Sequence, residues 1–252
     1  MQVEGAVAAV FGGASGLGEA TARRLAAGGA KVLVADLNAE RAAAVAGEID
    51  GAHVACDVAD AGSVEAAVAA AGKLGPLRIA VDCAGIATPT KLVRKGAATP
   101  LEDFARVIAV NLLGTINVLR CAAAAMAATE PVADGDRGVC VATASIAAYE
   151  GQIGQVAYAA SKAGVAGLTL PVARELAASR VRVLAIAPGL FDTPLLAGLP
   201  AAAREALAGS VPYPARLGDP AEYAALVEHV VVNTMLNGET IRLDGALRMG
   251  PS

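Results

Sequence analysis

The fold is set by the run Phe11-Gly12-Gly13-Ala14-Ser15-Gly16-Leu17-Gly18, which joins an apolar segment at 6–11 to a helical pattern that begins at Gly16. Its glycines, Gly12, Gly16 and Gly18 among them, let the backbone turn tightly and approach a pyrophosphate, while the first helical turn offers N–H groups and the positive end of its dipole. A glycine cluster alone often marks only a turn. Here strand, turn and helix occur in order, so the run predicts a dinucleotide-binding loop.

Short apolar runs alternate with helical patterns along the whole chain. We expect strands at 6–11, 31–35, 52–56, 77–81, 138–143, 181–187 and 240–243. We expect helices at 16–27, 39–48, 63–74, 101–128, 156–178 and 220–232. The alternation predicts one α/β domain over residues 1–252, a Rossmann-type doubly wound parallel sheet of about seven strands with helices on both faces.

Asp36 ends the second expected strand, eighteen residues after Gly18. A carboxylate at this place accepts hydrogen bonds from the adenosine ribose of a dinucleotide and repels a 2′-phosphate. No Arg or Lys occupies positions 13–17 or 37–40, where it would neutralise that phosphate. The sequence therefore predicts NAD, not NADP, as the cofactor.

Three more segments carry polar groups near the expected cofactor. Asp57 follows the third strand, and its carboxylate either bonds the adenine amino group or caps the next helix, with the sequence favouring neither. Asp82-Cys83-Ala84-Gly85 ends the fourth strand, where we expect the backbone to pass close to the cofactor. Asn111 lies among apolar neighbours in the expected helix 101–128, which indicates a buried amide that needs partners.

A catalytic group is predicted from Ser145, Tyr158 and Lys162. If the segment 156–178 is helical, the four-residue spacing of Tyr158 and Lys162 places the phenol and the ammonium on one face. A phenol is a poor proton donor at neutral pH, and an adjacent fixed cation favours the phenolate. Ser145 ends the apolar run 138–144 and offers a hydroxyl that can hold a carbonyl or alkoxide oxygen. A Tyr-x-x-x-Lys pair is usually only a solvated helix face, but the serine and the glycine loop together indicate an enzyme.

Composition argues against several other classes of protein. The 252 residues carry a net charge of −4 and only 3% aromatic side chains, so neither a broad nucleic-acid footprint nor a base-stacking surface is expected. Mean hydropathy is +0.55, yet no stretch combines 18 or more strongly apolar residues with an absence of charge, and we expect no membrane span. The four cysteines fit neither a zinc pattern nor a disulfide framework, and no metal site is predicted. The early first strand leaves no room for a targeting segment, so a cytoplasmic enzyme is expected.

A long excursion leaves the sheet after the sixth expected strand, at about 189–217, and contains four prolines. An excursion of this length at the carboxyl end of a strand is typical of a substrate lid. Leu195, Leu196 and Leu199 are predicted to form its apolar wall.

In this order, the residues resemble those of the short-chain dehydrogenases/reductases. The resemblance covers the whole chain and rests on the glycine loop 12–18, Asp36, the turn 83–85, Asn111, Ser145, Tyr158 and Lys162. More specific runs resemble a branch of that family that acts on 3-hydroxyacyl-CoA thioesters and 17β-hydroxysteroids; they lie at 101–104, 151–155, 187–191, 193–196, 216–223 and 241–245.

Two positions depart from the family pattern, which usually has Thr in place of Phe11 and Asn in place of Asp82. Both are expected beneath the cofactor, so they concern its affinity more than the fold. A carboxylate has no N–H to donate where the amide of the family does. We therefore expect a structural compensation around Asp82, not a catalytic role.

The resemblance implies hydride transfer between a nicotinamide cofactor and a secondary alcohol carbon. In this scheme Tyr158 is the general acid/base, Lys162 assists it and holds the nicotinamide ribose, Ser145 orients the substrate oxygen, and Asn111 supports a water relay. The residues implied to line the NAD site are Gly12, Ser15, Gly16, Leu17, Gly18, Asp36, Asp57, Val58, Cys83, Ala84, Gly85, Tyr158, Lys162, Pro188, Phe191 and Thr193.

The expected substrate is a 3-hydroxyacyl-CoA, oxidised to 3-oxoacyl-CoA; a hydroxysteroid or other secondary alcohol is the alternative, and a non-catalytic NAD-binding regulator is the minor one. Lys91, Arg94 and Lys95 form the densest basic cluster of the chain and follow the fourth strand, where ligands enter open sheets. Such a cluster is by itself more often a solvated loop, but with the resemblance it is predicted to meet the CoA phosphates, while Ser145, Tyr158, Leu195 and Leu196 contact the rest of the substrate. The resemblance also implies a homotetramer in which helices 101–128 and 156–178 pair across a two-fold axis.

Overall fold

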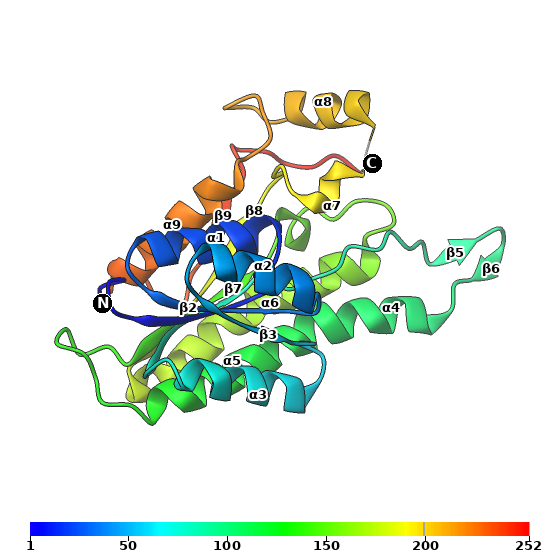
Figure 1. The fold of residues 1–252 in the computed structure, drawn as a ribbon. Helices are drawn as coiled ribbons and strands as arrows, with labels where there is room; N and C mark the ends of the chain where they lie inside the picture. Colours follow the sequence, from blue (N-terminus) through cyan, green and yellow to red (C-terminus); the bar gives the residue numbers. More distant parts are fainter. Residues whose placement is uncertain (199, 252) are drawn as a thin grey trace.

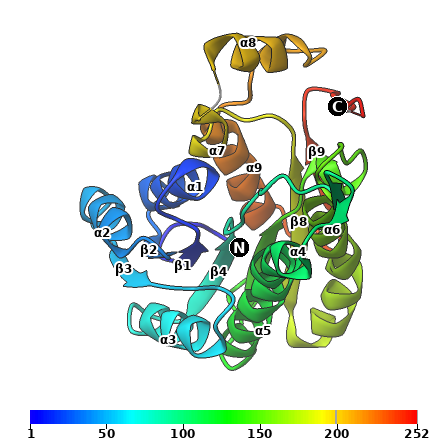
Figure 2. The same cartoon turned by 90° about the vertical axis from the view of Figure 1, so that its right-hand side faces the viewer.

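The computed structural model describes residues 1–198 and 200–251. Seven parallel strands form one sheet in the order β3-β2-β1-β4-β7-β8-β9 (Figures 1 and 2). They are β1 (Val7–Phe11), β2 (Lys31–Asp36), β3 (Ala52–Ala55), β4 (Leu77–Asp82), β7 (Gly138–Thr143), β8 (Val181–Pro188) and β9 (Thr240–Leu243). The predicted doubly wound sheet is confirmed, with strand ends that differ from the prediction by one residue at most.

Helices cover both faces of the sheet. One face carries α1 (Gly16–Ala27), α2 (Ala39–Glu48) and α9 (Pro220–Val232), and the other carries α3 (Ala61–Gly72), α5 (Gly114–Ala127) and α6 (Val156–Leu176), as Figure 1 shows. Strand β1 divides its side chains accordingly: Ala8 and Val10 face the first set, and Val7, Ala9 and Phe11 face the second. All five are buried, because a central parallel strand has helices on both sides.

The expected helix 101–128 is interrupted in the structure. It consists of α4 (Leu101–Ile108), a π-helical turn at Ala109–Leu113, and α5. The apolar pattern runs on through the turn, so hydrophobic periodicity cannot reveal it, and such insertions occur frequently at functional sites. The helix predicted at 63–74 also begins two residues earlier, because the Asp60 carboxylate accepts a bond from Ser63 N (2.6 Å) and caps α3.

The segment after β4 carries two strands that the sequence did not predict, β5 (Val93–Arg94) and β6 (Ala97–Ala98). They pair antiparallel through a turn at Lys95 and Gly96, whose φ angles are +50° and +80°. Figure 1 shows this hairpin extending away from the body of the molecule, and residues 91–98 are called the arm. Strands of two residues are too short to leave a hydrophobic pattern.

The excursion predicted as a lid is partly helical. It contains α7 (Pro194–Ala197) and α8 (Ala201–Gly209), and its two ends meet where Phe191 bridges Gly218. In Figures 1 and 2 these helices lie beyond the carboxyl edge of the sheet, and Val211, just after α8, packs with Leu247 of the C-terminal segment. We keep the name lid for residues 189–217.

Two helical stretches are long and apolar enough to cross a membrane by length and composition alone, which the sequence analysis did not anticipate. Leu101–Ala127 has a mean hydropathy of 1.7 and Val156–Ser179 one of 1.2, over windows that are 50% and 33% buried. Core helices meet the same criterion, and both stretches pack along one side against the sheet. Their outer sides expose Leu113, Ile116 and Leu170.

Candidate active site

A cleft of about 580 Å³ opens at the carboxyl ends of the strands. It lies beside β1 and β4, where the strand order reverses and where open α/β sheets bind their ligands. Many of the predicted cofactor residues line it: Gly12, Ser15, Gly16, Leu17, Gly18, Asp36, Asp57, Val58, Cys83, Ala84, Gly85 and Thr193. The sequence analysis missed other lining residues, which carry no motif: Leu37, Cys56, Ala59, Ile86, Arg106, Ala109, Val110 and Pro194.

The glycine loop is shaped for close approach of backbone to backbone. Gly12 has φ +70°, and a Cβ there would lie 2.6 Å from Ala84 N, while a Cβ on Gly18 would collide with Gly12 O. Ser15 is the N-cap of α1, but its side chain makes no capping bond within the described residues. Because residues 15–18 line the cleft, the positive end of α1 lies at the cleft, an arrangement that fits a pyrophosphate.

Asp36 stands at the carboxyl end of β2 with both carboxylate oxygens already engaged. One accepts from Ala14 N (3.0 Å) and the other from Asn38 N (2.9 Å), which fixes the carboxylate at the mouth of the cleft. Arg41 comes close to the same place, since its Nη2 lies 3.3 Å from Ala14 O and 3.3 Å from a Glu19 carboxylate oxygen. This arginine lies just outside the sequence window 37–40, and the first turn of α2 brings it back to the glycine loop.

The three predicted catalytic residues come from neighbouring elements. Ser145 follows β7 as the N-cap of a 3₁₀ turn (Ile146–Ala148), where its Oγ accepts from Ala147 N at 3.1 Å. Tyr158 and Lys162 stand one turn apart on α6, with Lys162 Nζ 5.9 Å from the centre of the Tyr158 ring. Lys162 is 4% exposed and donates to Thr143 O at 2.7 Å, so its ammonium is held between β7 and the phenol.

Asn111 lies in the π-helical turn and is fully buried, as the sequence analysis expected. Its Oδ1 accepts from Ile86 N (2.8 Å), and its Nδ2 donates to Ile86 O (2.9 Å) and Ser161 Oγ (3.2 Å). A Cβ on Gly85 would lie 3.3 Å from Asn111 Oδ1 and 3.5 Å from Lys162 Nζ. The amide therefore fixes the backbone at 85–86 beside Lys162.

Other predicted cofactor residues lie in different surroundings. Asp57 lines the cleft and accepts from Ala59 N (2.9 Å), while the cap of α3 is Asp60, so the helix-cap alternative for Asp57 does not match the structure. Pro188 and Phe191 are buried, and neither they nor Tyr158 and Lys162 are among the cleft-lining residues. Phe191 packs on Gly218, where a Cβ would lie 2.7 Å from the ring.

The two departures from the family pattern are both buried. Phe11 is fully enclosed in the core beneath α3 and α5, so its ring faces away from the cleft. Asp82 is 2% exposed at the end of β4, and its oxygens contact Thr115 Oγ1 (2.6 Å) and Ala84 N (3.1 Å). Burial raises the pKa of this carboxyl, while the Thr115 bond and the Lys162 ammonium act in the opposite direction.

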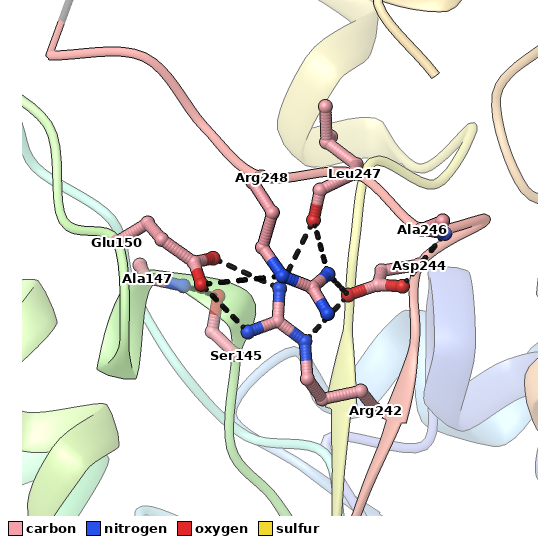
Figure 3. Close-up of polar contacts among 8 residues, drawn as sticks. All are labelled: Ser145, Ala147, Glu150, Arg242, Asp244, Ala246, Leu247 and Arg248. Atoms are coloured by element: carbon pink, nitrogen blue, oxygen red, sulfur yellow. Dashed lines mark hydrogen bonds and ion pairs between the residues drawn. The ribbon is translucent and has the colours of Figure 1, made fainter. Parts of the chain in front are cut away.

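A charged network that the sequence analysis missed supports the turn after Ser145 (Figure 3). Arg242 of β9 donates hydrogen bonds from both terminal nitrogens to the Glu150 carboxylate (2.8 Å each). Its Nε donates to the carboxylate of Asp244 at 2.6 Å. Arg248 donates to Asp244 as well, at 3.1 Å. Arg242 holds the pKa of Glu150 below its ordinary value. The network ties the catalytic turn to β9 and to the C-terminal segment, whose Pro251 O accepts from Ile153 N (2.9 Å).

The predicted substrate residues are not gathered at the cleft. Lys91, Arg94 and Lys95 are exposed on the arm, whose base is fixed by a bond from Thr90 N to Gly154 O (2.7 Å) next to the start of α6. Leu196 is half-buried in α7. Leu199 and the side chain of Leu195 lie outside what the structure describes.

Comparison with known proteins agrees with this geometry. The family model described as short chain dehydrogenase matches residues 6–204. The chain is 53% identical to "3-hydroxyacyl-CoA dehydrogenase type-2" of Drosophila melanogaster, over 99% of this chain and 100% of that protein, and 52% identical to the Homo sapiens protein of the same name, over 99% and 97%. A crystal structure of 3-hydroxyacyl-CoA dehydrogenase type-2 from Mycobacterium avium superposes with a TM-score of 0.95 at 46% identity, over 98% of each chain.

Proposed function

Because this chain belongs to the short chain dehydrogenase family and is an oxidoreductase of the kind that uses a nicotinamide cofactor, we propose that it oxidises 3-hydroxyacyl-CoA to 3-oxoacyl-CoA with NAD. The observation that carries this proposal is the placement of Ser145, Tyr158 and Lys162 at the sheet edge that also holds the glycine-loop cleft. The thioester substrate is supported by the names of relatives that match over nearly the full chain.

The chain's own groups account for the proton transfer. Tyr158 would take the hydroxyl proton of the substrate, and Lys162 Nζ lies 5.9 Å from the centre of its ring. Ser145 presents a hydroxyl that can hold the substrate oxygen, and its own Oγ is oriented by Ala147 N. A nicotinamide cofactor held by the glycine loop and Asp36 would supply the hydride acceptor for the alcohol carbon. The amide of Asn111 bonds to the backbone of Ile86 and so fixes the position of the cleft wall relative to Lys162.

The preference for NAD is supported by Asp36, whose fixed carboxylate disfavours a 2′-phosphate. Arg41 lies near enough to attract a 2′-phosphate, but its guanidinium is also engaged by Glu19. It therefore reduces the preference for NAD over NADP only in part. We therefore expect NAD to be the better cofactor, with NADP retaining measurable activity.

The proposed function is tested by following NADH absorbance with a panel of short- and branched-chain 3-hydroxyacyl-CoA thioesters, hydroxysteroids and small secondary alcohols. We expect the highest kcat/KM with a CoA thioester and NAD. A hydroxysteroid turned over more efficiently than every thioester would replace the proposal with the steroid alternative, and no turnover of any alcohol would favour a regulator that only binds NAD.

A homotetramer is proposed for the same protein. The outer sides of α5, α6 and the π-helical turn expose Leu113, Ile116 and Leu170, which the described part of the chain leaves uncovered and which a second copy could bury. Light scattering at micromolar concentration is expected to give a mass near four times 24.8 kDa. A mass near 24.8 kDa would exclude the assembly.

A further inference from the structure

Asp82 is a buried titratable group that the proposed reaction does not use. It is the last residue of β4 and lies between Phe11 of β1 and Ala142 of β7, directly below the Cys83-Ala84-Gly85 turn of the cleft. Only 2% of the residue is exposed, so bulk solvent does not reach its oxygens. The bonding of its two oxygens must therefore be explained by the protein itself.

If Asp82 is a carboxylate that only accepts, the single hydrogen of the Thr115 hydroxyl can serve only one of its two neighbouring oxygens. Thr115 Oγ1 lies 2.6 Å from Asp82 Oδ2 and 2.9 Å from Asn111 O, and both of these oxygens are acceptors. A hydroxyl has a single hydrogen to donate. With a proton on Oδ2, Asp82 donates to Thr115, Thr115 donates to Asn111 O, and every bond is made. The other oxygen, Oδ1, remains free to accept from Ala84 N at 3.1 Å.

The charges around Asp82 are compatible with a neutral acid. The titratable groups that face it are Lys162 of α6, Cys83 after β4, Cys56 after β3 and Tyr223 of α9. Phe11 and Ala142, its partners on β1 and β7, carry no charge. Lys162 is the cation of this set; its ammonium donates to Thr143 O, and its charge acts to lower the pKa of Asp82 against the effect of burial.

We propose that Asp82 is a protonated carboxylic acid at neutral pH and serves as a positioning residue for the catalytic site. Its proton reproduces the donor that the amide of the family provides. Through Thr115 it holds the helical turn of Asn111, which in turn holds Ile86 at the cleft. Because it is uncharged, it leaves the positive charge of Lys162 undiminished for the phenol of Tyr158. The kinetic consequence rests on the proposed function, whereas the protonation state does not.

The protonation state has a consequence for stability with a definite sign. A carboxyl whose pKa is higher in the folded than in the unfolded chain contributes stability that is complete below the unfolded pKa of about 3.9 and is lost as the pH rises toward the folded value. Asp82→Asn keeps an N–H donor for Thr115 and cannot ionise. The melting temperature of this variant should therefore exceed that of the wild type by a margin that grows with pH.

Two measurements test the proposal without any substrate. Infrared spectra of protein labelled with ¹³C-aspartate at pH 7 should show the C=O band of a protonated carboxylic acid, absent from Asp82→Asn and present in the control Asp50→Asn, which alters an exposed carboxylate. Between about pH 5 and pH 8 the melting-temperature advantage of Asp82→Asn should grow by a few degrees. Absence of the band, together with a constant difference in melting temperature, would overturn the proposal.

The positioning role is tested by rescue. Asp82→Ala should lower kcat/KM about tenfold, because Thr115 loses its donor at a buried site, and Asp82→Asn should restore most of this loss and bind NAD at least as well as the wild type. Thr115→Val should resemble Asp82→Ala. A large loss of activity in Asp82→Asn would show that the carboxyl group itself is used, and would overturn the role proposed here. Should Asp82→Ala fail to fold, the infrared and thermal measurements on Asp82→Asn still decide the protonation state.

Discussion

The cofactor side and the substrate side of this molecule are built in different ways. On the cofactor side, the ends of neighbouring strands bond directly to one another: Cys83 N donates to Phe11 O (2.8 Å) and Gly13 N to Ala35 O (3.2 Å). On the substrate side, the arm and the lid extend from the sheet and contact it mainly where they begin and end. The first region is an edge of the core, and the second is attached to that edge.

This difference shows what each region is able to do. A pyrophosphate site needs N–H groups at fixed positions, and strand ends in a packed sheet supply them. A substrate site has to admit and release a large ligand, and elements anchored at their ends can move while the catalytic residues stay in place. We therefore expect substitutions on the cofactor and catalytic side to have large effects, and those on the arm and lid to have graded ones.

The largest effect on the cofactor and catalytic side is expected for Tyr158→Phe. Removal of the hydroxyl eliminates the proton acceptor while leaving the ring on α6, so kcat should fall by at least about 100-fold and NAD binding should stay nearly intact. Steady-state kinetics measures kcat, and a titration with NAD measures the binding of the cofactor. Tyr149→Phe is the matched control, because that ring is half exposed and stacks on Arg242 (5.1 Å). Retention of more than about a tenth of kcat in Tyr158→Phe would contradict the assignment.

Cofactor choice should depend on Asp36. Asp36→Ala removes an acceptor for the ribose and a charge that repels a 2′-phosphate, and it also releases Ala14 N and Asn38 N. We expect KM for NAD to rise about tenfold and the advantage of NAD over NADP to narrow, since Arg41 then faces the phosphate with less opposition. Glu40→Ala, on the exposed side of α2, serves as the control. If Asp36→Ala left kcat/KM for NAD and kcat/KM for NADP both unchanged, Asp36 would not be the residue that recognises the ribose.

Substitutions on the arm test the substrate side of the molecule. Replacement of Lys91, Arg94 and Lys95 by Ala should raise KM for a CoA thioester several-fold, because three exposed cations each contribute only a modest interaction with phosphate. KM for a small uncharged ketone should change little. Lys73→Ala/Arg174→Ala is a control that removes exposed positive charge near the ends of α3 and α6, away from the carboxyl edge of the sheet. An equal change for both substrates would remove the argument for CoA and advance the steroid alternative.

The sequence predicts the cofactor and catalytic side far better than the arm and the lid. Glycines, Asp36, Ser145, Tyr158 and Lys162 have residue-specific chemistry at fixed spacing, and they converge at one sheet edge in the structure. The arm strands, in contrast, are two residues long, and the helices of the lid lack a clear apolar pattern. Neither length nor periodicity could have identified them.

Long-range pairs are the other part that escaped prediction. Thr115 meets Asp82 across 33 positions, Arg41 reaches the glycine loop across 27, and Arg242 pairs with Glu150 across 92. Thr115, Arg41 and Glu150 belong to no motif, and each pairing depends on how the chain packs around the sheet. The sequence thus indicated that the buried amide of Asn111 needs hydrogen-bond partners, but only the fold shows that Ile86 and Ser161 provide them.

The smallest predicted effect concerns the end of the lid, where Arg216 donates two bonds of 2.8 Å to the Glu222 carboxylate of α9. The same carboxylate accepts from Asp219 N (2.8 Å) in the capping box of α9. These bonds, from Arg216 above all, lower the pKa of Glu222 to about 2. Because the folded pKa is lower than the unfolded one, the stability that it contributes is present at neutral pH and is lost as the pH falls from about 4.5 to about 2.

Glu222→Gln should therefore lower the melting temperature at pH 7 by only about 1–3 °C, since the pair is largely exposed and solvent screens it. The difference from the wild type should shrink as the pH approaches 2. Glu205→Gln, an exposed change on α8, controls for the loss of one surface charge. A loss of stability that persists unchanged at low pH would mean that the amide disrupts the capping box itself, and that the lid is joined to the rigid body by helix geometry and not by the ion pair.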